Sequence, residues 1–234
     1  IRDLSPQGRQ PMTDPSGRFT LIYNGEIYNA DELKAQLQAA GIHQFKSTGD
    51  TELLLLAWSV WQEKTPEKLQ GEFAFAVWDH LRSSLTLCRD RLGIKPLYYV
   101  QKKGVFAFAS ELTALHQAGL VGEELSRPAI DSFLAFGSVL EPWTIYREGR
   151  VLEAGTFLTV DARDFAVSQK RFWENPFKQP PTFSSLNLSQ MEDLLRDAVT
   201  GRLVADAPLS IFLSGGIDSS CIAAAASNYK EEPT

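Results

Sequence analysis

Glu72-Phe-Ala-Phe-Ala-Val-Trp-Asp79, followed four residues later by Ser84-Leu-Thr-Leu-Cys-Arg89, is the stretch of sequence that decides the fold. Both segments are rich in β-branched and aromatic residues, as strands are. Pro96-Leu-Tyr-Tyr-Val100 and Val105-Phe-Ala-Phe-Ala109 have the same character and are also separated by short turns. The pattern predicts an antiparallel meander.

The residues before this stretch predict one more strand and two helices. Arg18-Phe-Thr-Leu-Ile-Tyr23 reads as a strand that Asn24-Gly25 ends. Asn29 is placed to cap a helix that Gly41 stops, and a second helix, 51–61, is apolar nearly all round. Because a sheet needs helices to cover it, we expect a layered α+β domain.

The amino-acid composition limits which classes of function are plausible for this chain. The 234 residues are 44% hydrophobic and 22% charged, enough for one sizeable core and the start of a second. No apolar run reaches the roughly 18 residues of a membrane span. A net charge of −6 without a basic stripe disfavours nucleic acid. His43, His80 and His116 lack ligand spacing, so no metal site is predicted, and Cys88 and Cys221, each in an apolar stretch, indicate two buried free thiols in a reducing cytoplasm.

The periodicity breaks after Phe157-Leu-Thr-Val-Asp161, which we expect to be the last strand. Three prolines between Glu174 and Asn187 predict an extended linker. Ser189 is placed to cap an amphipathic helix, which opens a new unit. The predicted organisation is a first domain over 1–165, a linker over 166–187 and an incomplete second domain over 188–234.

The second unit ends in a candidate phosphate-binding loop, Pro208-Leu-Ser-Ile-Phe-Leu-Ser-Gly-Gly-Ile-Asp-Ser-Ser220. An apolar strand leads into a glycine turn, where backbone N–H groups and serine hydroxyls meet an anion at a helix N-terminus. The spacing differs from a Walker loop, and the alternative is an ordinary serine-capped turn. The candidate residues are Leu213, Ser214, Gly215, Gly216, Asp218, Ser219 and Ser220.

Six ordered blocks of the chain resemble glutamine-dependent asparagine synthetases. The last of them, Ser214-Gly-Gly-Ile-Asp-Ser219, is similar to the pyrophosphate loop of ATP pyrophosphatases. The blocks before it are Tyr23-Asn-Gly-Glu-Ile-Tyr-Asn29, Ser47-Thr-Gly-Asp-Thr-Glu52, Phe73-Ala-Phe-Ala-Val-Trp-Asp79, Arg89-Asp-Arg-Leu-Gly-Ile-Lys-Pro-Leu-Tyr-Tyr99 and Phe108-Ala-Ser-Glu111. The resemblance implies an N-terminal-nucleophile hydrolase-type αββα sandwich, followed by the first elements of an α/β ATP-pyrophosphatase domain.

The resemblance implies a glutaminase site in the first domain. An N-terminal cysteine attacks the glutamine amide, with its own α-amino group as base. Asn24 and Gly25 match the family's oxyanion hole, and Glu26 and Asp50 match the residues that pair with the α-ammonium of glutamine. The alternatives from the residues alone are a hairpin turn at Asn24-Gly25 and a helix N-cap at Asp50.

For the second domain, the resemblance implies binding of ATP with Mg²⁺. Aspartate would be activated as β-aspartyl-AMP, and ammonia from glutamine would displace AMP to give asparagine. The implied partners are therefore glutamine, aspartate and ATP, with a homodimer as the default assembly and the cytoplasm as the location.

The chain departs from the family at both ends. It begins at Ile1, inside a family block, without the Cys-Gly opening, and stops soon after the pyrophosphate loop. We therefore expect full activity only of an intact parent. Three function classes stay open: amidation of aspartate or of a sugar or peptide carboxylate, a β-lactam or macrolactam type of ligase without glutaminase, and an inactive truncated product.

Overall fold

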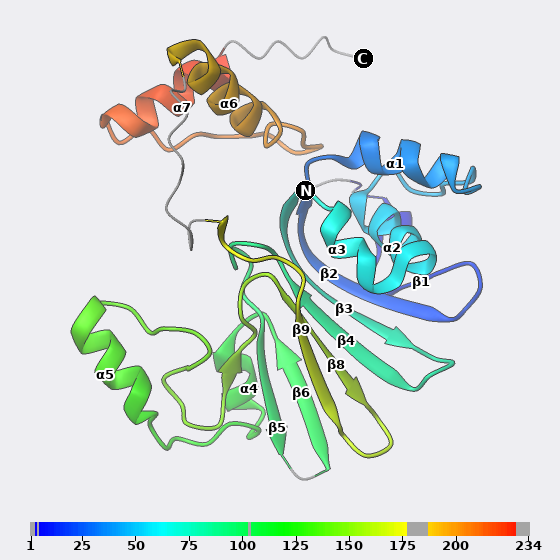
Figure 1. Ribbon diagram of the computed structural model, residues 1–234, viewed down its shortest axis with the longest axis vertical. Coiled ribbons are helices and arrows are strands. Elements are labelled where there is room, and N and C mark those ends of the chain that lie inside the picture. Colours follow the sequence, from blue (N-terminus) through cyan, green and yellow to red (C-terminus); the bar gives the residue numbers. More distant parts are fainter. Residues whose placement is uncertain (1–2, 4, 103, 177–186, 228–234) are drawn as a thin grey trace.

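Phenylalanine and alanine alternate along β3 (Gly71–Asp79), and this alternation builds two packing layers on the two faces of one strand (Figure 1). Phe73 and Phe75 enter a core shared with helices, whereas Ala74 and Ala76 enter a core shared with a second sheet. The computed structural model describes residues 3, 5–102, 104–176 and 187–227. Large side chains on one face and small ones on the other therefore set the order of the layers.

Two antiparallel sheets form the centre of the molecule. The larger sheet has the order β1-β2-β3-β4-β8-β9, with β1 Met12–Thr13, β2 Phe19–Ile27, β4 Ser84–Arg89, β8 Thr156–Asp161 and β9 Val167–Arg171. The smaller sheet has the order β6-β5-β7, with β5 Tyr98–Lys102, β6 Val105–Ala109 and β7 Arg150–Val151. The predicted meander thus divides after β4, and its last hairpin enters the second sheet.

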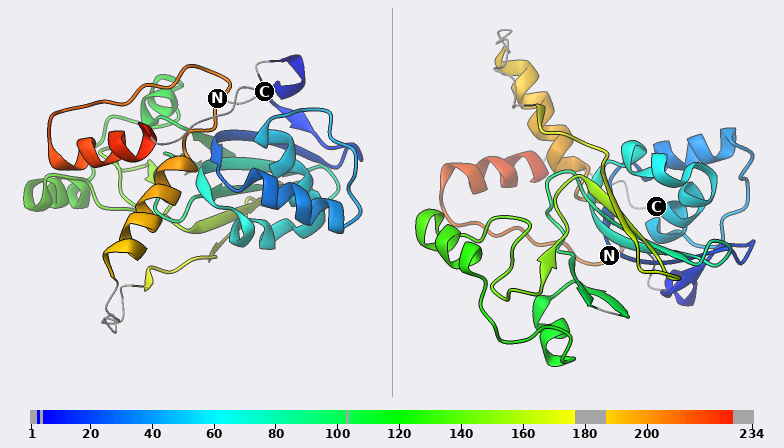
Figure 2. Two further views of the ribbon diagram at one scale, coloured as in Figure 1. Left: turned by 90° about the horizontal axis from the view of Figure 1, so that it is seen from above. Right: turned by 60° about the horizontal axis from the view of Figure 1, so that its bottom comes forward.

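Helices cover both outer faces of the sheet pair (Figures 1 and 2). The larger sheet is covered by α1 Ala30–Ala39, α2 Asp50–Trp61 and α3 Thr65–Lys68, and the smaller sheet packs on α4 Leu112–Gln117. Helix α5, Arg127–Phe136, lies to one side. The layers are therefore helix, sheet, sheet, helix, as predicted. No helix in the described part of the chain is long and apolar enough to span a membrane.

Two strand predictions were wrong. β2 continues through Asn24-Gly25 to Ile27, so this dipeptide is strand interior and makes no turn. Asp161 does not end the last strand, because β9 follows and pairs with β8 inside the range assigned to the linker. Every residue of β9 is exposed, so its sequence carries no burial pattern to detect. The predicted linker residues 177–186 lie outside the described residues.

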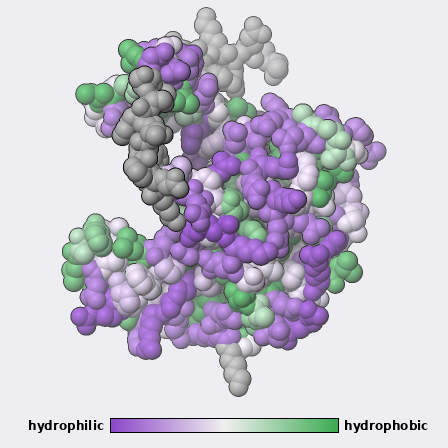
Figure 3. Space-filling model, in the orientation of Figure 1, coloured by the Kyte–Doolittle hydropathy of each residue, from purple (hydrophilic) through white to green (hydrophobic). Residues whose placement is uncertain are grey.

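The second unit contains α6 (Leu188–Thr200) and α7 (Ile217–Ser227). Asn187 caps α6, and not Ser189 as predicted, because Gln190 completes a capping box with Asn187. The predicted strand over 208–213 does not form. No strand among the described residues pairs with it, and Phe212 is 99% exposed. Apolar side chains consequently stand among the polar ones over α6 and α7 (Figure 3).

Candidate functional site

Three consecutive residues of β2, Asn24, Gly25 and Glu26, are among those predicted to bind glutamine. Asn24 is opposite Ala74 on β3, and Glu26 is opposite Glu72. Since side chains alternate along a strand, Asn24 and Glu26 share the face on which Ala74 packs toward the smaller sheet. Gly25 has no side chain on either face, and its position lies against the β3 backbone and the Tyr23 ring. The Asn24 amide and the Gly25 backbone N–H are thus donors of two neighbouring residues on one strand.

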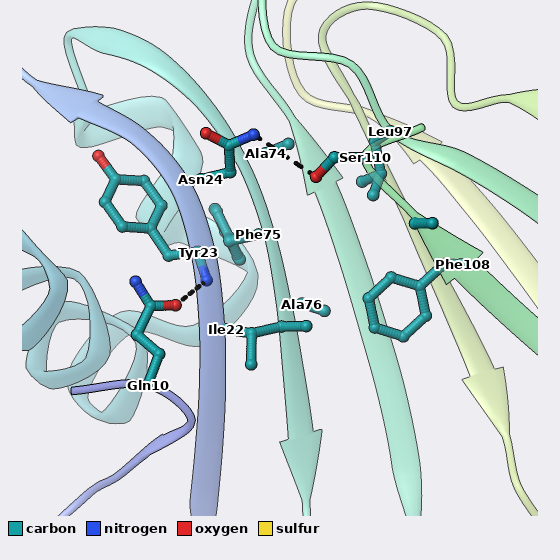
Figure 4. Close-up of a pocket in the computed structure, with 11 residues that line it drawn as sticks. Gln10, Ile22, Tyr23, Asn24, Ala74, Phe75, Ala76, Leu97, Phe108 and Ser110 are labelled. Atoms are coloured by element: carbon teal, nitrogen blue, oxygen red, sulfur yellow. Dashed lines mark hydrogen bonds between the residues drawn. The ribbon is translucent and has the colours of Figure 1, made fainter. Parts of the chain in front are cut away.

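Asn24 lines a cavity of about 160 Å³ between the two sheets (Figure 4). Its wall comes from β2, β3, β6 and the segments beside them: Gln10, Ile22, Tyr23, Asn24, Ala74, Phe75, Ala76, Leu97, Phe108, Ala109 and Ser110. This volume would hold about five water molecules. The Asn24 amide nitrogen lies 3.5 Å from the Ser110 hydroxyl, and Gln10 Oε1 accepts from the Tyr23 N–H at 2.6 Å. Asn24 therefore presents a donor at a small pocket with apolar walls.

Gly25 is required by the close approach of β3. A Cβ at this position would lie 2.2 Å from the Glu72 carbonyl oxygen and 2.7 Å from Phe73 Cα. Both contacts are with backbone, so no rotation of a side chain could relieve them. The glycine thus has a steric reason to be there besides any role of its N–H group.

Asp50 holds the same strand from the helical layer. Its Oδ2 accepts from the Tyr23 hydroxyl at 2.9 Å and from the Ile27 N–H at 3.0 Å, and the residue is 6% exposed. The N-cap of α2 is Gly49, so the alternative of Asp50 as N-cap is wrong. As the first residue of α2, the carboxylate lies where the helix dipole favours negative charge. Asp50 therefore ties the start of α2 to both sides of the Asn24–Glu26 segment.

The candidate phosphate loop gathers hydroxyls at the start of α7. Ser214 Oγ lies 3.0 Å from Ser219 Oγ, and the Ser219 and Ser220 hydroxyls donate to the Gly216 carbonyl. Gly215 has φ of +84°, a conformation that glycine adopts without strain. Asp218 is in the first turn of α7. The described residues contain no cluster of three or more His, Cys, Asp or Glu side chains able to hold a metal ion.

The two cysteines differ in accessibility, and this difference leads to a testable prediction. Cys88 is fully buried, and burial raises the pKa of its thiol well above its usual range. Cys221, expected to be buried, is exposed on α7. We expect a thiol reagent such as DTNB at pH 8 to modify Cys221 within minutes and Cys88 only after unfolding. Two fast-reacting thiols in the native chain would contradict this burial; Cys221→Ser should leave no fast phase.

Sequence reasoning did not single out Gln10 or Ser110 as site residues. Ser110 lies within the Phe108-Ala-Ser-Glu111 block, so its place in a block was the available signal. Nothing local showed that β6 would end beside Asn24, because the two residues are 86 positions apart and meet only when the sheets stack. The predicted Glu26, Gly25 and Asp50 do not line this cavity.

The layered part of the chain matches a known family. Residues 1–173 match the family model described as a glutamine amidotransferase domain. The chain belongs to this family. Residues 190–234 match the model described as asparagine synthase, so the chain joins segments that match two family models.

Curated relatives resemble the chain over nearly all of its length. Asparagine synthetase [glutamine-hydrolyzing] 3 of Bacillus subtilis is 37% identical over 228 residues, which are 96% of this chain and 37% of that protein. Asparagine synthetase [glutamine-hydrolyzing] 1 of the same organism is 34% identical over 95% of this chain and 35% of that protein. The chain therefore spans little more than a third of these relatives.

A solved glutamine amidotransferase supports the fold. The glutamine phosphoribosylpyrophosphate amidotransferase of B. subtilis superposes with a TM-score of 0.52 and 21% identity, over 73% of this chain and 33% of that one. At this identity the likeness concerns the fold alone. Together with the observed layers, it confirms the predicted αββα sandwich of the N-terminal-nucleophile hydrolase type.

Proposed function

We propose that the whole protein is a glutamine-dependent ligase that hydrolyses glutamine in the first domain and amidates an ATP-activated aspartate in the second. The observation that carries this proposal is the joining, in one chain, of a glutamine amidotransferase domain to a segment that matches asparagine synthase. The predicted domain limits, 1–165, a linker over 166–187 and a second domain from 188, stay a proposal, except that β9 extends the sheet of the first domain into the range assigned to the linker.

In the proposed glutaminase step, Asn24 and Gly25 stabilise the reaction intermediate. A cysteine thiolate bonds to the amide carbon of glutamine, the carbonyl oxygen becomes negative, and the Asn24 amide and Gly25 N–H donate to it. Collapse breaks the C–N bond and releases ammonia, and water then frees glutamate. Glu26 and Asp50 pair with the α-ammonium. Cys88 is too buried to be the nucleophile, which the family resemblance assigns to an N-terminal cysteine.

In the proposed ligase step, Leu213–Ser220 hold the pyrophosphate of ATP. The N–H groups at the start of α7 are donors suited to an anion, and the three serine hydroxyls would join them once those of Ser219 and Ser220 turn away from the Gly216 carbonyl. The aspartate β-carboxylate would attack the α-phosphorus, so that pyrophosphate leaves and β-aspartyl-AMP forms. Ammonia then attacks the carbonyl carbon and AMP leaves, which gives asparagine. Mg²⁺ would accompany ATP and neutralise phosphate charge.

A second candidate differs in the acceptor. Amidase chry2 of Gibberella zeae is 32% identical over 240 residues, which are 100% of this chain and 34% of that protein. A relative with a different name that matches both segments favours the class of amidotransferases that act on another carboxylate.

The test is to replace Asn24 with alanine in the whole protein. We expect the glutamine-dependent rate to fall by about 100- to 1000-fold, because one oxyanion donor is lost. Asparagine and AMP formation with ammonium as nitrogen donor should stay unchanged, since that route bypasses the first site. The measurement is glutamate, AMP and asparagine formed from glutamine, ATP and aspartate.

Asn24→Asp is the matched variant, because it keeps the side chain's shape but replaces the amide donor with an acceptor. It should be at least as inactive with glutamine as Asn24→Ala. Full glutaminase activity in either variant would reject Asn24 as the donor. ATP consumption without AMP would reject the adenylate step, and turnover only with another carboxylate would establish the second candidate.

A further inference from the structure

Arg202 links the second unit to the glutaminase sheet. Two residues beyond α6, its Nε and Nη2 both lie 3.3 Å from Glu72 Oε1 on β3. Its guanidinium carbon stands 4.6 Å above the centre of the Tyr28 ring, a cation–π distance. Nη1 donates to the Ala198 carbonyl of α6 at 2.7 Å. The last turn of α6 therefore orients the guanidinium that reaches the sheet.

The residues that Arg202 contacts lie at the end of the glutamine-binding row, which is the row of β2 side chains, Asn24 and Glu26, that we predict to bind glutamine. Glu72 is directly opposite Glu26, and directly opposite residues in an antiparallel pair share a face. Tyr28 is two positions beyond Glu26. Figure 1 shows the chain after α6 passing close to the end of β2, in agreement with these contacts. Arg202 thus caps the end of the Asn24–Glu26 row.

The charges at this point favour a cation. Two carboxylates directly opposite each other on neighbouring strands repel. Burial, together with a hydrogen bond to Glu72 and its charge, raises the pKa of Tyr28 well above its usual range, so this hydroxyl stays protonated and donates to Glu72. A positive group beside Glu72 offsets the repulsion of Glu26. The planar guanidinium suits this position because it can stack on an aromatic ring and bind a carboxylate at once.

A second contact joins the same parts of the molecule. Asp206 Oδ2 accepts from the Asp3 N–H at 2.8 Å. Gly201, the neighbour of Arg202, lies so close to Tyr28 that a Cβ there would be 3.7 Å from the Tyr28 Cβ. The segment 201–206 therefore lies against the first domain at more than one residue. Arg202 supplies the ion pair within this contact.

We propose that Arg202 is the residue that docks the phosphate-loop unit onto the end of the glutamine-binding row, through Glu72 and Tyr28. Docking there orders the end of β2 and the last turn of α6 together. Its consequence for catalysis, that the unit with the ATP loop is positioned against the strand that binds glutamine, rests on the proposed function. The docking contact itself requires no ligand and can be tested without one.

The test is hydrogen exchange of the ligand-free 234-residue chain, with Arg202→Ala compared to Arg196→Ala. Arg196 is the matched control, because it lies on α6 and pairs with Asp193 of the same helix. The reporters are the Tyr28 N–H, which donates to the Gln70 carbonyl, and the Gly201 N–H, which donates to the Asp197 carbonyl. Amides in the middle of β3 serve as the internal reference for global unfolding.

We expect Arg202→Ala to exchange at least tenfold faster at both reporters, with the reference amides unchanged, and Arg196→Ala to match the parent chain. Glu72→Ala should reproduce the effect, and the double variant should add nothing further, because the two residues act as one contact. Arg202→Lys keeps the positive charge but loses the planar guanidinium, so its exchange rates at the two reporters should lie between those of the parent chain and of Arg202→Ala. Equal exchange in Arg202→Ala and Arg196→Ala would overturn the proposal, whatever the outcome of the glutaminase assays.

Discussion

Replacing Asp90 with alanine is expected to lower the free energy of unfolding by about 3–5 kcal/mol. Asp90 is 1% exposed and follows β4. Its carboxylate accepts from four backbone N–H groups: Oδ1 from Leu92 and Ile94, and Oδ2 from Lys95 and Phe73. Alanine would leave these donors without their acceptor in a region from which most water is excluded.

Urea unfolding followed by circular dichroism measures this loss, with an unchanged m-value as the sign that both states keep their compactness. Asp164→Ala is the matched control, since this exposed carboxylate accepts from the Ala166 N–H in another turn. It should change stability by no more than about 0.5 kcal/mol. An Asp90→Ala chain as stable as the Asp164→Ala chain would show that the turn after β4 does not depend on the carboxylate.

Arg89, beside Asp90, illustrates how far charge clusters can be interpreted from sequence. The dense charges at 89–95 are consistent, in the sequence alone, with either a domain-contact element or a buried ion-pair network that stabilises the sheet, and the second is the favoured interpretation. Arg89 is indeed buried, and it makes an ion pair with Glu141. Its other donors reach the carbonyls of Gly93, Lys95 and Leu152. The arginine thus joins the turn to the strand-connecting segments of both sheets, and sequence cannot show partners that are backbone atoms distant along the chain.

The strands that could be predicted are those with a buried face. Glu72–Asp79 and Ser84–Arg89 match β3 and β4 within one residue, because apolar side chains mark their burial. β9 was missed because Val167–Arg171 is an exposed edge. The strand over 208–213 was predicted from its apolar residues alone, yet a strand also needs a neighbour to accept its hydrogen bonds. The pattern of apolar residues in the sequence therefore predicts which segments are buried better than it predicts which strands pair.

The cavity at the candidate site could not be predicted from the sequence. Asn24 and Glu26 lie on β2 and Asp50 binds the same strand, but their roles toward glutamine stay a prediction. The cavity at Asn24 depends on Phe108 of the second sheet and on Leu97 and Ser110 next to its strands. Their approach follows from the stacking of two sheets, which local periodicity does not encode. For the same reason, the contact of Arg202 with Glu72 spans 130 residues and had no signal in the sequence.

Replacing Gly25 with alanine is expected to lower the free energy of unfolding by about 3 kcal/mol or more. The added methyl would meet the Glu72 carbonyl oxygen at 2.2 Å, so β2 and β3 would have to separate at the centre of the larger sheet. Gly71→Ala should have a similar effect, because its Cβ would lie 2.2 Å from the Glu26 carbonyl oxygen across the same strand pair. Urea unfolding of both variants measures the two losses.

Gly122→Ala is the control, since its Cβ would meet only the end of the Glu148 side chain, at 3.3 Å. This variant should unfold at the urea concentration of the parent chain, and equal stability of Gly25→Ala and Gly122→Ala would disprove the close approach. The clash of an added Cβ at Gly25 with the β3 backbone also affects the interpretation of glutaminase assays on variants of this strand. Gly25→Ala would lose activity through the sheet alone, whereas Asn24 is exposed, and its truncation should leave stability unchanged. Only the Asn24 variants can therefore report on the oxyanion hole.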